Sequence, residues 1–294
     1  MTNERKSRIT SVTDSTINFV DDLEGAASGS RVRSTPRIAT GFDDLDRLQA
    51  ITAPSVTVLF GPPAVGTSML ALNIATHSAQ DGIPALVVSW ESPKSEIVLR
   101  VHSSLSRTHT IAMRTGAMSE DSWVKFAGSM ANLDKLDLSL APGPRTWAEL
   151  EALVHEWHED VAAGTPSVLV LDGAPNLARL SSTPSQSVWE EHSRLSVNVR
   201  HMAYELGIAV VMTVPVVREA LAAREYLKLQ HVAYSPAYVH DADVVIAVSR
   251  DDLVNPESPR AGEADLAILK SRHTPTDTVT LAFQGHYSRF VNMR

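Results

Sequence analysis

The chain has 294 residues, of which 44% are hydrophobic and 20% charged, the proportions of a globular protein with a sizeable core. Its 26 Lys+Arg and 34 Asp+Glu give a net charge of −8, which argues against a small basic nucleic-acid binder, although a local basic patch or a ring of subunits could still hold DNA. The lack of cysteine excludes disulfides, thiolate metal sites and a catalytic thiol. No apolar run approaches the length of a membrane span and no signal-peptide pattern is present, so we expect a cytoplasmic protein with no membrane partner.

Residues 1–37 differ in composition from the rest and are rich in Ser, Thr, Arg and Gly. Within them Ile17, Phe19, Val20 and Leu23 form an apolar stripe at helical spacing, which ends at the GAASGS stretch. A single helix this short is not stable alone in water. We therefore predict an N-terminal arm with one helix that docks either on its own core or on a neighbouring subunit.

Residues 38–294 alternate apolar strands with helical segments, which predicts a single α/β domain with no internal repeat. The strands are expected at 55–60, 85–90, 167–172, 208–214 and 243–249, with a closing antiparallel hairpin at 264–270 and 278–283. Helices are expected after Gly66, near Pro93, after Ser119, and over 147–161 and 187–206. Continuous Val/Ile/Leu strands between helices are typical of a mainly parallel sheet covered on both faces.

The first strand runs into a Gly-rich turn, Gly61–Ser68, that opens a helix. The spacing is that of the phosphate loop G-x-x-x-x-G-K-[S/T], with Thr67 in place of the lysine. Backbone N–H groups of such a loop face phosphate oxygens at a helix N-terminus, and Ser68 would place a hydroxyl on Mg²⁺. The candidate nucleotide-binding residues are Gly61, Pro63, Gly66, Thr67 and Ser68.

The lost lysine is one charge-assisted contact of about 1.5–3 kcal/mol, so binding would weaken roughly 10- to 150-fold while the backbone cradle remains. The alternative is that this turn is simply a strand-to-helix connection of an α/β protein.

Two carboxylates follow strands at the edge where ligands bind in open α/β folds. Glu91 comes directly after the second strand and could orient an attacking water. Asp172 ends the third and could hold Mg²⁺ through Ser68 or water. Each alone is more often an ordinary strand-end carboxylate, but their joint placement favours function. Lys94, three residues beyond Glu91, is a candidate substitute for the missing lysine.

The sequence resembles the C-terminal motor domain of DnaB-type replicative helicases over about residues 13–294. The resemblance begins at Thr40–Asp46 and continues through the phosphate loop and Ser89-Trp90-Glu91. The further motifs that carry it are Arg114-Thr115-Gly116, Ser119–Trp123, Asp241–Val245, Asn255–Pro259, Lys270-Ser271-Arg272 and Phe283–Phe290. The last group is the most specific.

The resemblance implies a RecA-like P-loop NTPase fold that assembles as a ring of about six subunits or a helical array, with ATP and Mg²⁺ at the subunit interfaces. Glu91 would match the catalytic base and Asp172 the acid on the Mg²⁺ side. Lys270 and Arg272 would match the lysine and the arginine finger that act in trans, on the neighbour's nucleotide. The arm would match the linker helix that docks on the adjacent subunit.

Three departures from the family pattern concern its chemistry. Thr67 replaces the loop lysine, and the family's sensor glutamine falls on Pro215. The DNA-gripping stretch reads Val232–Pro236, with Ala233 where the family has its phosphate-contacting arginine. We also expect the family's N-terminal primase-interaction domain to be missing. Together these departures indicate a helicase relative that has lost its motor.

Other charged residues give weaker signals. Arg179, Arg194 and Arg200 flank the segment after Asp172 that faces the central channel in this family, so Arg179 and Arg194 are candidates for weak DNA binding, with ordinary surface arginines as the alternative. His155 and His158 lie three residues apart on one predicted helix, but no third ligand is identifiable, which favours a polar helix face over a metal site.

Three functions remain open. The first is an oligomeric scaffold or regulator with weak or absent ATP hydrolysis. The second is an active ATP-dependent DNA helicase or translocase with an unorthodox phosphate loop. The third is a subunit that caps or joins a true replicative helicase ring. Thr67, Pro215 and Val232–Pro236 favour the first and third. The second stays open because four family residues are retained: Glu91, Asp172, Lys270 and Arg272.

Overall fold

A computed structural model describes residues 12, 16, 20, 24, 37–131, 133–162, 164–181, 187–222 and 226–293. The chain divides into two compact units, residues 1–37 and 38–294. In the first unit Val12, Thr16, Val20 and Glu24 are helical, and the Thr16 hydroxyl donates a hydrogen bond to the Val12 carbonyl. Of the predicted apolar stripe only Val20 is described; Ile17, Phe19 and Leu23 lie outside the described residues.

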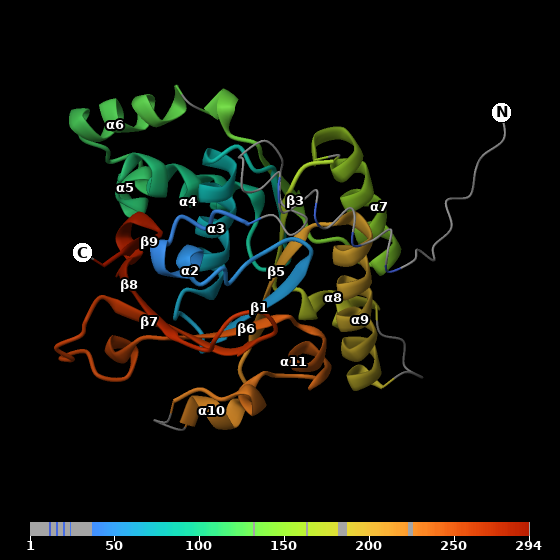
Figure 1. Ribbon diagram of the computed structural model, residues 1–294. Helices are drawn as coiled ribbons and strands as arrows, with labels where there is room; N and C mark the ends of the chain where they lie inside the picture. Colours follow the sequence, from blue (N-terminus) through green and yellow to red (C-terminus); the bar gives the residue numbers. More distant parts are fainter. Residues whose placement is uncertain are drawn as a thin grey trace, which may run out of the picture. The chain divides into compact units, whose positions relative to one another are not determined.

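The second unit is built on a nine-stranded sheet whose spatial order is β3-β2-β4-β5-β1-β6-β7-β8-β9 (Figure 1). The six strands from β3 to β6 are parallel, and β7, β8 and β9 add antiparallel strands at one side. The strands are β1 (Ser55–Gly61), β2 (Ala85–Ser89), β3 (Leu138–Pro142), β4 (Val168–Asp172), β5 (Ala209–Pro215), β6 (Val244–Ser249), β7 (Glu263–Ser271), β8 (Thr278–Gln284) and β9 (Arg289–Asn292).

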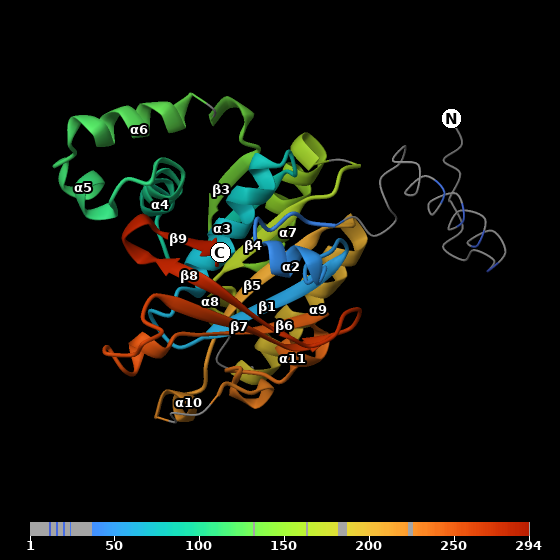
Figure 2. The ribbon, with the colours of Figure 1, turned by 60° about the vertical axis from the view of Figure 1, so that its left-hand side comes forward.

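Helices cover both faces of this sheet (Figures 1 and 2). One face packs on α2 (Asp43–Arg47), α3 (Thr67–Gln80) and α4 (Lys94–Ser106). The other packs on α7 (Trp147–Trp157), α8 (Pro175–Ser181), α9 (Val188–Leu206) and α11 (Ala237–Asp241). The remaining helices are α5 (Thr110–Thr115), α6 (Glu120–Met130) and α10 (Arg218–Ala222). Among the described residues no helix is long and apolar enough to cross a membrane.

Side-chain alternation along β1 divides the core into two layers. Leu59 is buried in the layer under α3, whereas Val58 and Phe60 are buried in the layer under α9. Every residue of β1 is buried, as expected for a central parallel strand covered on both faces. The strand therefore has no solvent-exposed face, and a ligand could reach it only at the turn that follows Gly61.

The predicted fold class is confirmed: a mainly parallel sheet between helices, with antiparallel strands at the C-terminal end. The sequence did not predict β3, β9, α5 or the short helices α2, α8, α10 and α11. The edge strand β3 has mostly half-buried side chains, α5 is one short helix, and β9 extends the closing hairpin to three strands. The predicted helix over 147–161 ends at Trp157 and continues as a π-helical turn over His158–Ala162.

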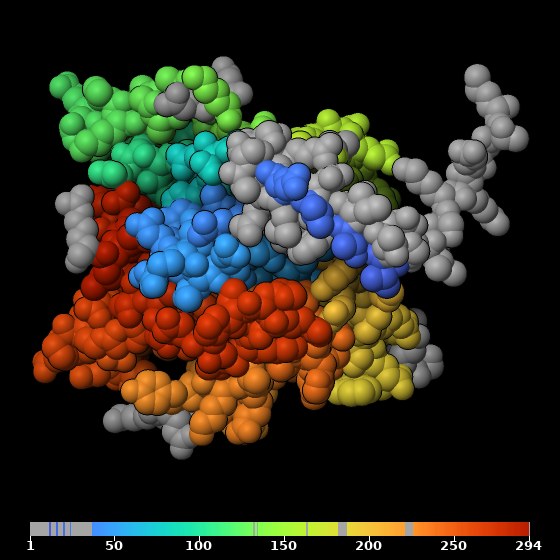
Figure 3. Space-filling view, viewed as in Figure 1, coloured from blue at the N-terminus to red at the C-terminus, as the bar shows by residue number. Residues whose placement is uncertain are grey.

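The two ends of the second unit lie side by side (Figure 3). The backbone N–H of Asp43, in α2, donates to Asn292 Oδ1 in β9 over 3.0 Å. Asn73 of α3 fastens the same strand, because its amide donates to the Ser288 carbonyl and accepts from the Phe290 N–H. The C-terminal strands are thereby held against α3, the helix that begins at the Gly-rich turn.

Candidate nucleotide site

The turn Gly61–Ser68 links β1 to α3 at the carboxyl edge of the parallel strands. Ala64 and Gly66 have positive φ values of 65° and 109°. A Cβ on Gly66 would lie 2.9 Å from Phe290 Cζ, so glycine is required there both by conformation and by close approach. Thr67 then opens α3, and the Leu70 N–H donates to the Gly66 carbonyl as the first helical bond. The loop therefore has the strand–turn–helix geometry in which backbone N–H groups face an anion.

Asp172 ends β4 at the same edge and is almost fully buried. Its carboxylate accepts hydrogen bonds from the hydroxyls of Ser89 (2.9 Å) and Thr213 (3.1 Å), each from a neighbouring strand. Thr213 in turn accepts from the Gly173 N–H at 2.7 Å. Among the described residues no hydrogen bond joins Asp172 to Ser68. Two hydroxyl donors leave lone pairs on the carboxylate, so it fits a water-mediated cation contact.

Glu91 follows β2 beside Asp172. Its Oε1 accepts a hydrogen bond from the Asn176 side-chain amide at 2.8 Å, and its backbone N–H donates to the Ser89 hydroxyl at 3.1 Å. A Cβ on Gly173 would come within 2.6 Å of Glu91 Cγ, so the two segments approach closely. Asn176 was not predicted from the sequence. The strand-end position of Asp172 four residues earlier is the only sequence signal that could have found it.

Pro215 ends β5 and pairs with Gly61 in the parallel register of β1 and β5. It is exposed, and its carbonyl accepts the Ala233 N–H at 3.0 Å. The position predicted for the sensor glutamine is therefore adjacent to the start of the phosphate loop, with a side chain that neither donates nor accepts a hydrogen bond.

Arg250 is a cation at the loop that the sequence analysis missed. It follows β6, its Nη1 donates to the Ala64 carbonyl at 3.4 Å, and its Cζ lies 3.5 Å from the centroid of the Phe283 ring. Asp252 pairs with the same guanidinium, and this hydrogen bond is the main cause of the lowered pKa of Asp252. The signal was present in the sequence, because Arg250 directly follows a predicted strand that ends at this edge.

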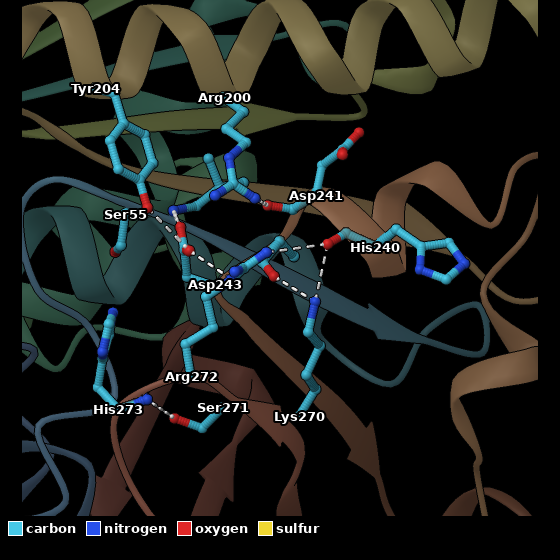
Figure 4. Close-up of polar contacts among 12 residues, drawn as sticks. Ser55, Arg200, Tyr204, His240, Asp241, Asp243, Lys270, Ser271, Arg272 and His273 are labelled. Atoms are coloured by element: carbon cyan, nitrogen blue, oxygen red, sulfur yellow. Dashed lines mark hydrogen bonds and ion pairs between the residues drawn. The ribbon is translucent and has the colours of Figure 1, made fainter.

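Lys270 and Arg272 lie at the amino-terminal ends of the parallel strands, opposite the phosphate loop, where β7 ends beside the start of β6 (Figure 4). Arg272 Nε pairs with Oδ1 of the fully buried Asp243 at 3.0 Å. Asp243 also accepts the backbone N–H of Val56, near the start of β1. Five residues of strand, or about 16 Å, separate Val56 from Gly61. The structure thus does not bring Lys270 and Arg272 to the phosphate loop of their own chain.

The ammonium group of Lys270 is saturated by its own chain. It donates to the carbonyls of Val239 (2.6 Å), His240 (3.0 Å) and Ala242 (2.7 Å), which uses all three of its donors. Burial and then the charge of Arg272 lower its pKa. Arg200 adds a further cation to this cluster, because its Nη1 donates to the Asp241 carbonyl at 2.8 Å. Any trans role for Lys270 requires that some of these bonds break.

The segment Val232–Pro236 is fastened to its own domain. Ala233 donates to Pro215, the ring of Tyr234 stacks on that of His192 at 4.5 Å, and the Ser235 hydroxyl lies 3.0 Å from that of Ser193. His192 and Ser193 belong to α9, so this helix holds the segment in place.

The candidate DNA-binding arginines lie on α8 and α9. Arg179 is exposed on α8, and Arg194 of α9 pairs with Glu191 at 3.0 Å.

The two histidines considered as metal ligands, His155 and His158, lie at the end of α7 and the start of the π-helical turn. Burial lowers the pKa of His158. Among the described residues no group of three or more His, Asp or Glu side chains could hold a metal ion. Lys94 begins α4 and is exposed.

A family model described as the DnaB-like helicase C terminal domain matches residues 37–292. The chain is 29% identical over 286 residues to the replicative DNA helicase DnaB of Leifsonia xyli subsp. xyli, with 96% of this chain and 61% of that protein covered. It is 30% identical over 288 residues to the replicative DNA helicase DnaB of Mycobacterium leprae, with 91% of this chain and 47% of that protein covered. The chain thus spans about half to three-fifths of the length of these relatives.

Solved structures share the fold. One of them, described as an ATPase domain, superimposes with a TM-score of 0.86 at 20% identity and covers 97% of this chain and 100% of that one. A DnaB-like replicative helicase, solved in a study of its interactions with primase, superimposes with a TM-score of 0.83 at 19% identity and covers 97% of this chain and 68% of that one.

Proposed function

Because the chain belongs to the DnaB-like helicase C-terminal domain family, we propose that it is an oligomeric, helicase-like protein that binds ATP–Mg²⁺ weakly and acts as a scaffold or regulator rather than as a motor. In this proposal residues 38–294 are the RecA-like domain and residues 1–37 are an assembly arm. The observation that carries it is Thr67, the first residue of α3, at the position of the loop lysine.

The residues at the carboxyl edge fit a nucleotide except that the loop lacks a lysine. The loop backbone at Gly61, Pro63 and Gly66 would cradle the phosphates, and Ser68 would hold Mg²⁺ together with Asp172 through water. When bound, ATP–Mg²⁺ would supply the phosphoryl group for hydrolysis. Glu91, positioned by Asn176, would orient the attacking water. The charge that the lysine would place on the phosphates is missing from the loop, so we expect binding to be weak and turnover slow or absent.

Motor function also needs a sensor and a DNA grip, and both positions are altered. Pro215 cannot sense a phosphate through its side chain, and Ala233 offers no charge to a DNA backbone. The net charge of −8 adds no general attraction for DNA. Arg179 and Arg194 remain candidates for weak contacts with single-stranded DNA.

The retained Glu91 and Asp172 favour the second candidate, an active ATP-dependent helicase. The position of Lys270 and Arg272, away from their own loop, also suits a subunit that caps or joins a true replicative helicase ring.

The deciding experiment is unwinding of a forked DNA duplex by the full chain with ATP and Mg²⁺. We expect no unwinding, and ATP turnover that single-stranded DNA does not stimulate. Thr67→Lys alone should not restore unwinding, because it rebuilds neither the sensor nor the grip. Unwinding by the wild-type chain that disappears in Glu91→Gln would contradict the proposal and establish the active helicase instead.

A further inference from the structure

A basic cavity lies behind the phosphate loop, between the C-terminal ends of α3 and α4 and the edge strand β9. Its volume is about 260 Å³. The polar side chains that line it are His77, Gln80, Ser104, Arg107, Arg289 and Asn292. Thr67 and His77 are ten residues apart on α3, so about 15 Å of helix separate this cavity from the loop.

The two arginines of this cavity have no anionic partner. Arg107 is exposed, in the left-handed region at φ 54°, and among the described residues it makes no hydrogen bond or ion pair. Arg289 is half-buried and donates from Nε to the neutral Gln284 side chain at 2.7 Å. Burial, and then the charge of Arg107, lower the pKa of Arg289, so the two guanidinium groups are close enough to repel.

No described carboxylate lines the cavity. Asp46 and Asp81 line an adjoining cavity that shares Gly41, His77 and Gln80 with this one. Asp46 is already engaged, because it accepts the Thr40 N–H at 2.9 Å and the Thr40 hydroxyl at 2.7 Å. The positive charge of the arginines is therefore not neutralised inside the cavity.

Helix ends account for only part of this charge. α3 ends at Gln80 and α4 at Ser106, and each helix C-terminus carries about half a negative charge. These partial charges are smaller than the two full charges of Arg107 and Arg289, so the helix ends do not replace an anionic partner. Uncompensated guanidinium groups in a concave, polar site are suited to a phosphate, whose oxygens match the planar fork of arginine.

We propose that this cavity binds the phosphate or diphosphate group of a small ligand, held by Arg107 and Arg289. A cavity of about 260 Å³ accommodates a diphosphate but leaves little room for a nucleoside, whose base would extend outside. The ligand is therefore free phosphate or pyrophosphate, or the diphosphate end of a nucleotide. This inference does not depend on nucleotide binding at Gly61–Ser68.

The test is calorimetric titration of the full chain with pyrophosphate and, separately, with ADP. Arg107→Asn removes the charge and suits a left-handed backbone, and Arg289→Gln keeps an amide donor beside Gln284. Either change should weaken pyrophosphate binding at least tenfold, and Arg107→Lys should weaken it less. Arg47→Gln, which alters an exposed arginine paired with Asp44, is the matched control and should bind like wild type.

Ser68→Ala separates this cavity from the phosphate loop. Pyrophosphate binding that survives Ser68→Ala but is lost in Arg107→Asn supports the proposal. If Arg107→Asn weakens ADP binding to the same extent, the cavity takes the diphosphate end of a nucleotide. Unchanged binding in both arginine variants would overturn the proposal. Loss of binding in Ser68→Ala alone, or no measurable pyrophosphate binding by the wild-type chain, would do the same.

Discussion

At the scale of single residues, position 67 decides how much of the site's chemistry can operate. Thr67 opens α3 where the family pattern has a lysine, and the strand–turn–helix arrangement around it is kept. A cation that contacts the loop is Arg250, which is already paired with Asp252. In the proposed nucleotide site the loop backbone would therefore bind phosphates without the charge of a loop lysine.

We predict that Thr67→Lys tightens ATP binding by one to two orders of magnitude, because it restores a charge-assisted contact of about 1.5–3 kcal/mol. Titration with a fluorescent ATP analogue in the presence of Mg²⁺ measures the change. Thr67→Ser, which keeps a neutral hydroxyl, is the control and should bind like wild type. Equal affinity of the lysine variant and wild type would mean that the loop does not contact phosphates, or that Arg250 or Lys94 already supplies the charge.

At the scale of elements, the central strands and the loop could be predicted from the sequence because their signals are local. Continuous apolar runs such as 55–60 predict buried strands, and the glycines of the turn predict a helix N-terminus. Other features depend on contacts between distant segments. Asn176 meets Glu91 only because β2 and β4 are neighbours, and Lys270 meets three carbonyls only because β7 returns beside β6. The edge strand β3 was missed because its half-buried side chains give a weak pattern.

The contact between α9 and α11 gives a prediction about pH. His192 of α9 is fully buried, and its Nδ1 lies 2.7 Å from the Tyr238 hydroxyl of α11, while its Nε2 has no partner among the described residues. Burial, and then the charge of Arg179, lower the pKa of His192 to about 4. The unfolded chain, with an ordinary histidine pKa of about 6.5, thus binds a proton that the folded chain excludes.

We therefore expect the free energy of unfolding to fall as the pH drops from 6.5 towards 4. The contribution of His192 between pH 7.5 and pH 5 is about 2 kcal/mol. Urea unfolding at the two pH values measures it, with His192→Gln as the comparison. The variant should lose most of that difference and keep the part due to other histidines such as the half-buried His77, whose pKa burial also lowers. An identical pH dependence in the variant and the wild type would contradict the assignment.

At the scale of the whole molecule, the residues expected to act on one nucleotide lie at two edges of the same sheet. Gly61–Ser68, Glu91 and Asp172 follow the carboxyl ends of the parallel strands, whereas Lys270 and Arg272 lie near Val56 at the other ends. β1, which spans the gap of about 16 Å between the two groups, is fully buried and paired on both sides, so the two groups do not meet within one chain. If these residues act together, a second copy of the chain must supply one half of the site.

Assembly of several chains through the N-terminal arm would supply the second half of the site. The spacing of Ile17, Phe19, Val20 and Leu23 predicts a helical apolar stripe too short to be stable alone, so we expect it to dock on a neighbouring subunit. Deleting residues 1–30 should convert an oligomer into monomers, and Ile17→Asp combined with Phe19→Asp should do the same without shortening the chain. Ser15→Asp adds a charge beside the stripe rather than in it and is the matched control.

Light scattering coupled to size-exclusion chromatography at tens of micromolar, with and without ATP–Mg²⁺, measures the mass of each variant. A full-length chain that is monomeric under both conditions would contradict docking in trans. Lys270 and Arg272 would then have no neighbouring nucleotide to reach, and their bonds to Asp243 and to the carbonyls that precede it would be their whole role. An oligomer that survives the paired aspartate substitutions would instead place the interface on residues 38–294.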